Sequence, residues 1–491
     1  MDDIKLANSF EKAEKSMKRN NLFIVKQIAG SKYLLPVGQM IAEQCRGIKI
    51  NSTSEYIWEQ LTEDISFDEL ISRCISEFEI DDNGAETLIS DVKKLLAAFR
   101  DRGMIEGSSN KFRCGCSRCR NRLPLPEPEW FEELDGKESN RQRVHFGNFE
   151  IGGLPVEMYG DEGFFDKAFE SFRIHDQGTY EKMKNKAGAP MNIEIIDVNT
   201  IGYPEKNNPT DMYSYYDTQE AEERKSEEIR IETDKSEVTG HGAEEKSKEY
   251  NLRLNGDNQK KGGIGKTLLH HNDLTVLEYH SRYVLFLNEL DGVEELHLSK
   301  DGRYAIVYCD SSVSDVKANL SNAIRMAFLI YGLMNGRVML HSCSVLLGDK
   351  VIAFSGPSGT GKSTHGALWK KIYNVPIING DLNFIGMEAG VPYVYGTPWC
   401  GSSGIYENRK RRLGGIVLLK QKAENIIESL DLELKILLVQ QRLITSIWNR
   451  EMLDKTFKIV EEIVSGLYVK RYFCNKEDDA ARKLHDDICK Q

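Results

Sequence analysis

The sequence has few features of a membrane-embedded, secreted or nucleic-acid-binding protein. No run among its 491 residues reaches the roughly 18 consecutive apolar residues that a membrane-spanning helix needs. The first twenty residues have no apolar core, so we expect no secretory signal there. Acidic residues outnumber basic ones by 76 to 65, and the net charge of −11 argues against binding to nucleic acid or to anionic membranes. We therefore expect a cytoplasmic protein with neither kind of partner.

Cysteine is sparse and mostly scattered. The chain has ten cysteines, and without an export signal we expect reduced thiols rather than disulfides. One group differs, because Cys114, Cys116 and Cys119 lie close together among arginines. A structural zinc site usually needs four ligands, whereas nearby arginines favour thiolates and redox sensitivity. A metal site, a redox site and a plain solvated linker all remain open for this group.

The length predicts about three domains, and the apolar pattern divides the chain in that way. We expect an α/β multidomain protein in which a polar insertion lacks the apolar residues needed to offset its chain entropy. The expected parts are a small winged-helix-like domain at 21–107, a Cys- and Pro-containing linker at 108–144, a β-rich subdomain at 145–203 and 268–312, the disordered insertion at 204–267, and an α/β core at 313–491.

The first of these parts carries a family resemblance. Apolar runs predict strands at 22–25, 33–35 and 48–50, followed by helices at 52–61, 66–78 and 83–102. Asn51 or Ser52 is placed to cap the first helix, and Ser66 with Glu69 has the form of a capping box. Together with Tyr33-Leu34 and the run from Asn51 to Leu61, this order resembles a PqqD-like domain.

The resemblance implies recognition of the leader of a ribosomally made precursor peptide. In that family the leader adds a strand to an exposed sheet edge, which here would be near Gly47–Ile50, with the helix from Asn83 as the other wall. A generic winged-helix-like adaptor is the alternative. A DNA-binding version is disfavoured, because the third helix mixes a few basic residues with several acids.

Two segments have the composition of a phosphate-binding loop. The first, Lys261–Thr267, follows a polar stretch and leads into a turn and a strand, so we expect no nucleotide site there. The second, Gly356–Ser363, fits G-x-x-x-x-G-K-[ST] between an apolar strand at 351–354 and a helix beginning at Thr364. Glycines let backbone N–H groups converge on phosphate oxygens, and the helix N-terminus adds positive charge. The predicted nucleotide-binding residues are Gly356, Pro357, Ser358, Gly359, Thr360, Gly361, Lys362, Ser363 and Thr364.

Lys362 is expected to reach the β- and γ-phosphates of ATP, and Ser363 to ligate Mg²⁺. The next apolar strand, at 375–378, leads to Asn379-Gly380-Asp381. Asp381 is therefore the expected second Mg²⁺ ligand and the group that takes a proton from an attacking hydroxyl. A loop aspartate that only caps a turn is the alternative.

The region 315–485 resembles HPr kinases and phosphoenolpyruvate carboxykinases. A long helix at 320–334, the strand with Leu340-His341, the loop and Asp381 carry the resemblance, which implies that His341 lies close to the phosphates. A core histidine at a strand end is the plainer alternative for His341. His365 is expected on the helix surface or behind the site. The end of the chain is expected to be helical over 432–464 and 474–488, with Asn475 or Asp478 capping the last helix.

The sequence departs from true HPr kinases at two places. Gly380-Asp381 stands where they have two adjacent acids, and their Glu-x-Arg-Gly signature is missing. The segment Thr397–Gly401 and a basic run follow instead, a pattern similar to lasso-peptide kinases. We expect Thr397–Gly401 to line the acceptor pocket and Arg409, Arg411 or Arg412 to stabilise the transferring phosphoryl group, unless the run is simply a solvated face.

These observations predict a kinase that uses ATP and Mg²⁺ to phosphorylate a hydroxyl, most plausibly serine, of a precursor peptide held by the first domain. Fusing the two domains raises the local concentration of the acceptor. The resemblance also allows a homo-oligomer and contact with other peptide-maturation enzymes. The alternatives are a non-catalytic peptide-binding module switched by nucleotide, and a kinase of a free small molecule such as serine.

Overall fold

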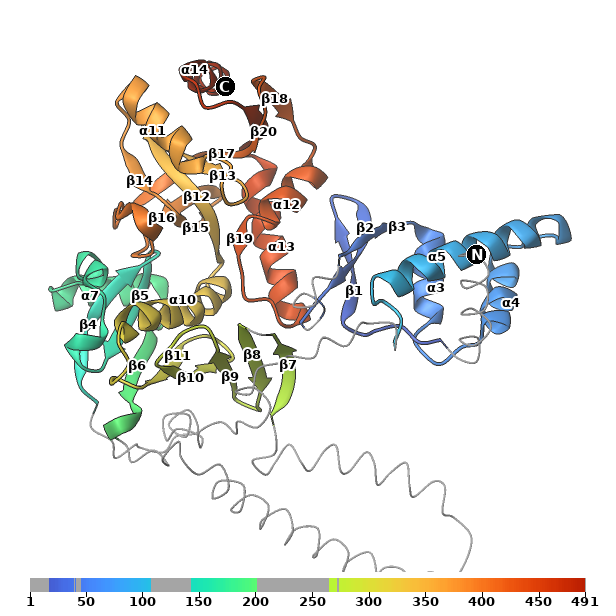
Figure 1. Cartoon of the computed structure of the whole chain (residues 1–491), viewed down its shortest axis with the longest axis horizontal. Coiled ribbons are helices and arrows are strands. Elements are labelled where there is room, and N and C mark those ends of the chain that lie inside the picture. Colours follow the sequence, from blue (N-terminus) through green and yellow to red (C-terminus); the bar gives the residue numbers. More distant parts are fainter. Residues whose placement is uncertain are drawn as a thin grey trace, which may run out of the picture.

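The protein is a mixed α/β protein, and its arrangement is taken from a computed structural model (Figure 1). The structure describes residues 17–38, 40, 46–106, 143–200, 265–271 and 273–490. The cysteine group at 114–119 and nearly all of the expected polar insertion lie outside these residues. Among the helices of the described residues, none is both long and apolar enough to cross a membrane.

The N-terminal domain is a three-stranded antiparallel sheet followed by three helices. The sheet has the order β1-β2-β3, with β1 at Phe23–Ile28, β2 at Ser31–Pro36 and β3 at Ile48–Ile50. The helices are α3 at Ser52–Gln60, α4 at Phe67–Glu77 and α5 at Asp82–Asp101. Asn51 caps α3 and Ser66 caps α4 through their side chains, as predicted.

The two faces of this small sheet pack in different directions. Phe23, Leu34 and Ile50 point to the domain's own core, where Trp58 and Phe99 are buried. The alternate residues Ile24, Ile28 and Tyr33, with Val37, belong instead to the large core that includes the C-terminal part of the chain. Because strand side chains alternate between faces, the sheet is covered on both sides. The N-terminal domain is therefore docked on the rest of the protein.

The middle of the chain forms an eight-stranded sheet with the order β4-β5-β6-β11-β10-β9-β8-β7. Its strands are β4 at His145–Ile151, β5 at Leu154–Tyr159, β6 at Met191–Asp197, β7 at Lys266–His270, β8 at Leu274–Glu278, β9 at Arg282–Leu287, β10 at Val293–Ser299 and β11 at Tyr304–Cys309.

Helices lie between β5 and β6. They are α7 at Gln177–Ala187 and the short 3₁₀ helices η1 at Glu162–Phe164 and η2 at Lys167–Phe172; η3 at Val198–Thr200 follows β6. The expected end of the insertion at residue 267 was wrong, because Lys266 and Thr267 already belong to β7. β7 is an edge strand, where charged side chains such as that of Lys266 are common.

The C-terminal part is built on a third sheet, with the order β13-β12-β15-β16-β17-β20-β18. β13 also pairs with β17, so β13, β12, β15, β16 and β17 form a closed ring of strands. The strands are β12 at Arg337–Leu347, β13 at Lys350–Ser355, β14 at Ile377–Asn379, β15 at Leu382–Glu388, β16 at Val391–Tyr395, β17 at Lys410–Gln421, β18 at Ile426–Ser429, β19 at Leu443–Ile444 and β20 at Tyr468–Cys474.

Helices flank this sheet. Near the C-terminus, their bounds differ from the predicted helical segments at 432–464 and 474–488. They are α10 at Val316–Met334, α11 at Lys362–Tyr373, the 3₁₀ helix η4 at Gly401–Ser403, α12 at Leu432–Gln440, α13 at Arg450–Ser465 and α14 at Asp478–Ile488. The single helix expected over 432–464 was wrong, because Leu443 and Ile444 form β19 on β12. The last helix is preceded by strand residue Cys474 and has Glu477, neither Asn475 nor Asp478, at its N-cap.

Candidate functional site

The segment Gly356–Gly361 connects β13 directly to α11, in the strand–loop–helix context predicted for a phosphate loop. Gly359 and Gly361 have φ angles of 77° and 96°, which favour glycine. A Cβ atom on Gly356 would lie 2.7 Å from Oγ1 of Thr360 and 2.9 Å from the carbonyl oxygen of Leu419. No side chain caps the N-terminus of α11. Its first N–H groups therefore face the loop, as an anion site requires.

Lys362 lies inside this loop rather than in solvent. Its Nζ donates to the carbonyl oxygens of Gly356, at 3.1 Å, and Pro357, at 3.3 Å. Burial lowers the pKa of Lys362, and the negative charge of Asp381 opposes that shift. Ser363 and Thr364, in the first turn of α11, are exposed. The ammonium group of Lys362 and the hydroxyls of Ser363 and Thr364 thus all belong to the first turn of α11.

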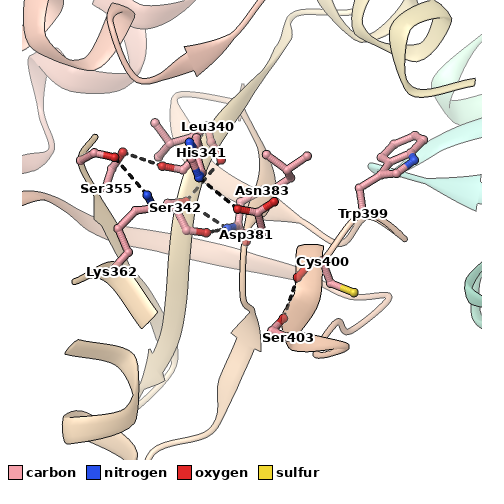
Figure 2. A network of polar contacts seen from close by, with 12 residues as sticks. Leu340, His341, Ser342, Ser355, Lys362, Asp381, Asn383, Trp399, Cys400 and Ser403 are labelled. Atoms are coloured by element: carbon pink, nitrogen blue, oxygen red, sulfur yellow. Dashed lines mark hydrogen bonds and ion pairs between the residues drawn. The ribbon is translucent and has the colours of Figure 1, made fainter. Parts of the chain in front are cut away.

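His341 and Asp381 form a pair next to this lysine (Figure 2). His341 belongs to β12 and Asp381 lies between β14 and β15, and Nε2 of the histidine is 3.0 Å from Oδ1 of the aspartate. The pKa of Asp381 is lowered, first by the hydrogen bond from His341 and then by the charges of His341, Lys362 and Arg325, against the opposing effect of burial. Asp381 is therefore ionised at neutral pH.

A buried polar network holds the pair in place. Oδ1 of Asn379 accepts from the backbone N–H of Asp381 at 2.8 Å, and the N–H of Ser342 donates to the Asp381 carbonyl at 2.8 Å. Nδ2 of Asn383 donates to the Ser342 carbonyl at 2.7 Å. The Ser355 hydroxyl, at the start of the loop, donates to the His341 carbonyl at 2.7 Å. The loop, the histidine and the aspartate therefore share one rigid support.

The segment Thr397–Gly401 lies against Asp381, and its role in lining an acceptor pocket stays a prediction. A Cβ atom on Gly401 would be within about 3 Å of the Asp381 carboxyl group, and Thr397 donates to the Leu382 carbonyl at 2.9 Å. Trp399 ties this loop to α10 by donating from Nε1 to the Ser321 carbonyl at 3.1 Å.

The backbone at Gly380, beside Asp381, is closely packed. A Cβ atom on Gly380 would lie 2.1 Å from Oγ of Ser403 and 2.5 Å from its Cβ. Any side chain at position 380 would therefore displace the loop that contains Ser403. The site as folded has room for one carboxylate, that of Asp381.

The arginines of the basic run lie in two different surroundings. Arg409 and Arg411 both pair with Glu407, at 3.3 and 2.8 Å. Arg412 lies opposite Lys350, at the start of β13, whereas the phosphate loop follows the other end of that strand. Arg412 therefore lies at the end of β13 away from the loop, and the prediction was wrong for Arg412; the role expected of Arg409 or Arg411 stays a prediction.

Two arginines that the sequence analysis missed lie at the site instead. Arg325, on α10, lowers the pKa of Asp381, and its own pKa is lowered by burial. Arg442 follows α12; its positive charge lowers the pKa of Lys362, and its carbonyl oxygen accepts from the N–H of His341 at 3.0 Å. The sequence did contain a signal for Arg325, because this charged residue stands between the apolar residues Ile324 and Met326 in a predicted helix.

His365 was expected on the helix surface or behind the site, and it is buried behind the loop, with 2 % of its surface exposed. It packs between Phe354 and Tyr472, and neither ring nitrogen has a hydrogen-bond partner among the described residues. Burial lowers its pKa to about 4. His365 is therefore a neutral core residue at physiological pH.

The donor set fits Mg²⁺ with a triphosphate. An ionised carboxylate and a hydroxyl are oxygen ligands of the kind that Mg²⁺ takes together with phosphate oxygens. Asp381 and Ser363 supply these two groups. No cluster of three or more His, Cys, Asp or Glu side chains suited to a metal occurs within the described residues. The other phosphate-loop-like segment, Lys261–Thr267, runs into β7, which is followed by β8. Its first four residues lie outside the described part of the chain.

Comparison with known proteins bears on the N-terminal domain. Residues 38–105 match the family model described as coenzyme PQQ synthesis protein D (PqqD). This confirms the PqqD part of the resemblance, a domain type that binds precursor peptides in peptide-modification pathways. No curated protein matches the chain.

Proposed function

We propose that this protein is an ATP-dependent kinase that phosphorylates a serine hydroxyl of a ribosomally synthesised precursor peptide. The observation that carries the proposal is the phosphate loop with Lys362 beside the His341–Asp381 pair. The match of residues 38–105 to PqqD supports a peptide as the partner. The kinase assignment rests on the motif and its geometry, together with the resemblance to HPr-kinase-like enzymes.

Each group has a distinct role in this proposal. The loop N–H groups and Lys362 hold the β- and γ-phosphates, and Ser363 and Asp381 hold Mg²⁺, which supplies charge neutralisation when bound. Asp381 accepts the proton of the serine hydroxyl as its oxygen bonds to the γ-phosphorus. The bond from that phosphorus to the bridging oxygen breaks, and ADP leaves. His341 keeps the Asp381 carboxylate ionised and oriented.

A nucleotide-switched, non-catalytic peptide-binding module is the second candidate. It is favoured by the single carboxylate, since Gly380 is packed against Ser403 and the site has no second acid beside Asp381. In that case nucleotide would bind and the peptide would receive no phosphate.

Transfer of label from γ-labelled ATP separates these functions. We expect label on the serine of a peptide encoded beside this protein; binding without label favours the switched module, and label on free serine indicates a small-molecule kinase. Asp381→Asn should abolish transfer while nucleotide still binds. The matched control is Asp349→Asn, a carboxylate at the other end of the sheet near Arg412. Unchanged transfer in Asp381→Asn would remove Asp381 from the mechanism.

A further inference from the structure

Beside the apolar packing of Ile24, Ile28 and Tyr33, one carboxylate of the C-terminal part collects several polar contacts from the N-terminal domain. Glu433, in the first turn of α12, accepts from the hydroxyl of Tyr33, from Ser31 at 2.7 Å and from Nζ of Lys49 at 2.9 Å. These three donors come from β2 and β3. Their hydrogen bonds lower the pKa of Glu433 to about 2, so the contact is made by an ionised carboxylate.

Lys49 lies in β3, the edge strand to which the PqqD family adds a peptide. A side chain of an added strand directly opposite Lys49 would be about 5 Å from it on the same face of the sheet. That face is the one toward α12, because Lys49 pairs in register with Tyr33 and both reach Glu433. Leu432 and Leu434, on either side of Glu433, are 36 % and 38 % exposed. A peptide on β3 would therefore lie beside the start of α12.

The other end of α12 leads to the phosphate site. The N–H of Arg442 donates to the Val439 carbonyl at 2.9 Å, so Arg442 is fixed to the last turn of the helix. Leu443 pairs with Leu340 in β12, and the Arg442 carbonyl accepts from the N–H of His341. The charge of Arg442 acts on Lys362. A short helix of nine residues thus separates the peptide edge from the phosphate loop (Figure 1).

We propose that α12 couples the two sites, so that a peptide on β3 shifts Arg442 beside the phosphate loop and changes nucleotide binding. This inference rests on the proposed function, because it assumes that nucleotide binds at Gly356–Ser363. It differs from simple tethering, in which the N-terminal domain only raises the local concentration of the acceptor. Coupling between sites is reciprocal, so nucleotide must also affect β3.

That reciprocity allows a test without a known peptide. Amide hydrogen exchange is measured on the full chain with and without a non-hydrolysable ATP analogue and Mg²⁺. We expect slower exchange at the loop and, in the wild type, an about fivefold change at α12 and at β3. Glu433→Ala should abolish the change at β3 while the loop still responds, and Tyr33→Phe, which removes one donor, should reduce it.

The matched control is Asp454→Asn. Among the described residues, Asp454 makes a second ion pair between the two parts, with Lys26 at 2.6 Å, but it belongs to α13, which begins only after Arg442 in the chain. This variant should keep the response at β3. If nucleotide slows amide exchange at the loop of the wild type but leaves exchange at β3 and α12 unchanged, the coupling is overturned and the nucleotide site is not. A full β3 response in Glu433→Ala also overturns it. A loop that does not respond to nucleotide overturns the proposed function and the coupling together.

Discussion

The N-terminal domain and the C-terminal part of this chain give opposite kinds of information. The N-terminal domain matches a family model, and none of its described residues is among those assigned above to the phosphate site. The C-terminal part contains the loop, the His341–Asp381 pair and two nearby arginines. A short binding domain is recognised by its pattern, whereas a catalytic site is argued from the geometry of specific residues. Mutations should therefore affect the binding domain and the phosphate site largely separately.

The largest effect is expected in the N-terminal core. Trp58 is buried and packs edge to face on Phe99, with ring centroids 5.6 Å apart. Trp58→Ala should destabilise this domain by about 3–5 kcal/mol, because it leaves a large cavity. Calorimetry should show a separate early transition, while affinity for Mg²⁺-ATP changes little. Loss of nucleotide binding in step with this unfolding would mean that the two parts fold as one unit.

Lys362→Ala tests the C-terminal half in the same way. Removing the buried ammonium from the loop should lower the rate of phosphoryl transfer about 10²–10³-fold, as for loss of one charge-stabilising donor. The matched control is Lys266→Ala, in the other phosphate-loop-like segment, where the lysine is exposed on β7. If both variants lost the same fraction of the transfer rate, our assignment of the phosphate loop to Gly356–Ser363 rather than Lys261–Thr267 would be contradicted. Peptide binding should be unaffected in both.

Residues close to a motif in the chain could be predicted from the sequence, whereas residues brought to the site from remote segments could not. The loop, Asp381 and the His341 position were predictable because each lies next to an apolar strand in the chain. Arg325 and Arg442 were not, because helices remote in sequence bring them to the site. The docking of the N-terminal sheet was also missed, although β1 has apolar residues at the adjacent positions 23, 24 and 25. Such a run is typical of a strand buried on both faces.

A third prediction concerns pH and the support of the loop. The pKa of His365 is lowered from 6.5 to about 4 by burial, so the folded state binds fewer protons than the unfolded state as pH falls. Because of this group alone, the free energy of unfolding should fall by about 3 kcal/mol between about pH 7 and about pH 4. His365→Phe, between Phe354 and Tyr472, should remove that part of the dependence in urea titrations. An identical pH profile in the variant would show that His365 stays neutral or is solvated.

The smallest effect is expected at the contact between the two halves. Lys26 and Asp454 form an ion pair whose side chains are 22 % and 40 % exposed. Pairs of this kind contribute about 0.2–1 kcal/mol and are screened by salt. Asp454→Asn should therefore barely change stability, and the difference from wild type should vanish at about 1 M salt. A loss that is large and independent of salt would mean that Asp454 supports the packing of β1 on α13, and the two parts would then be less separable by mutation than we expect.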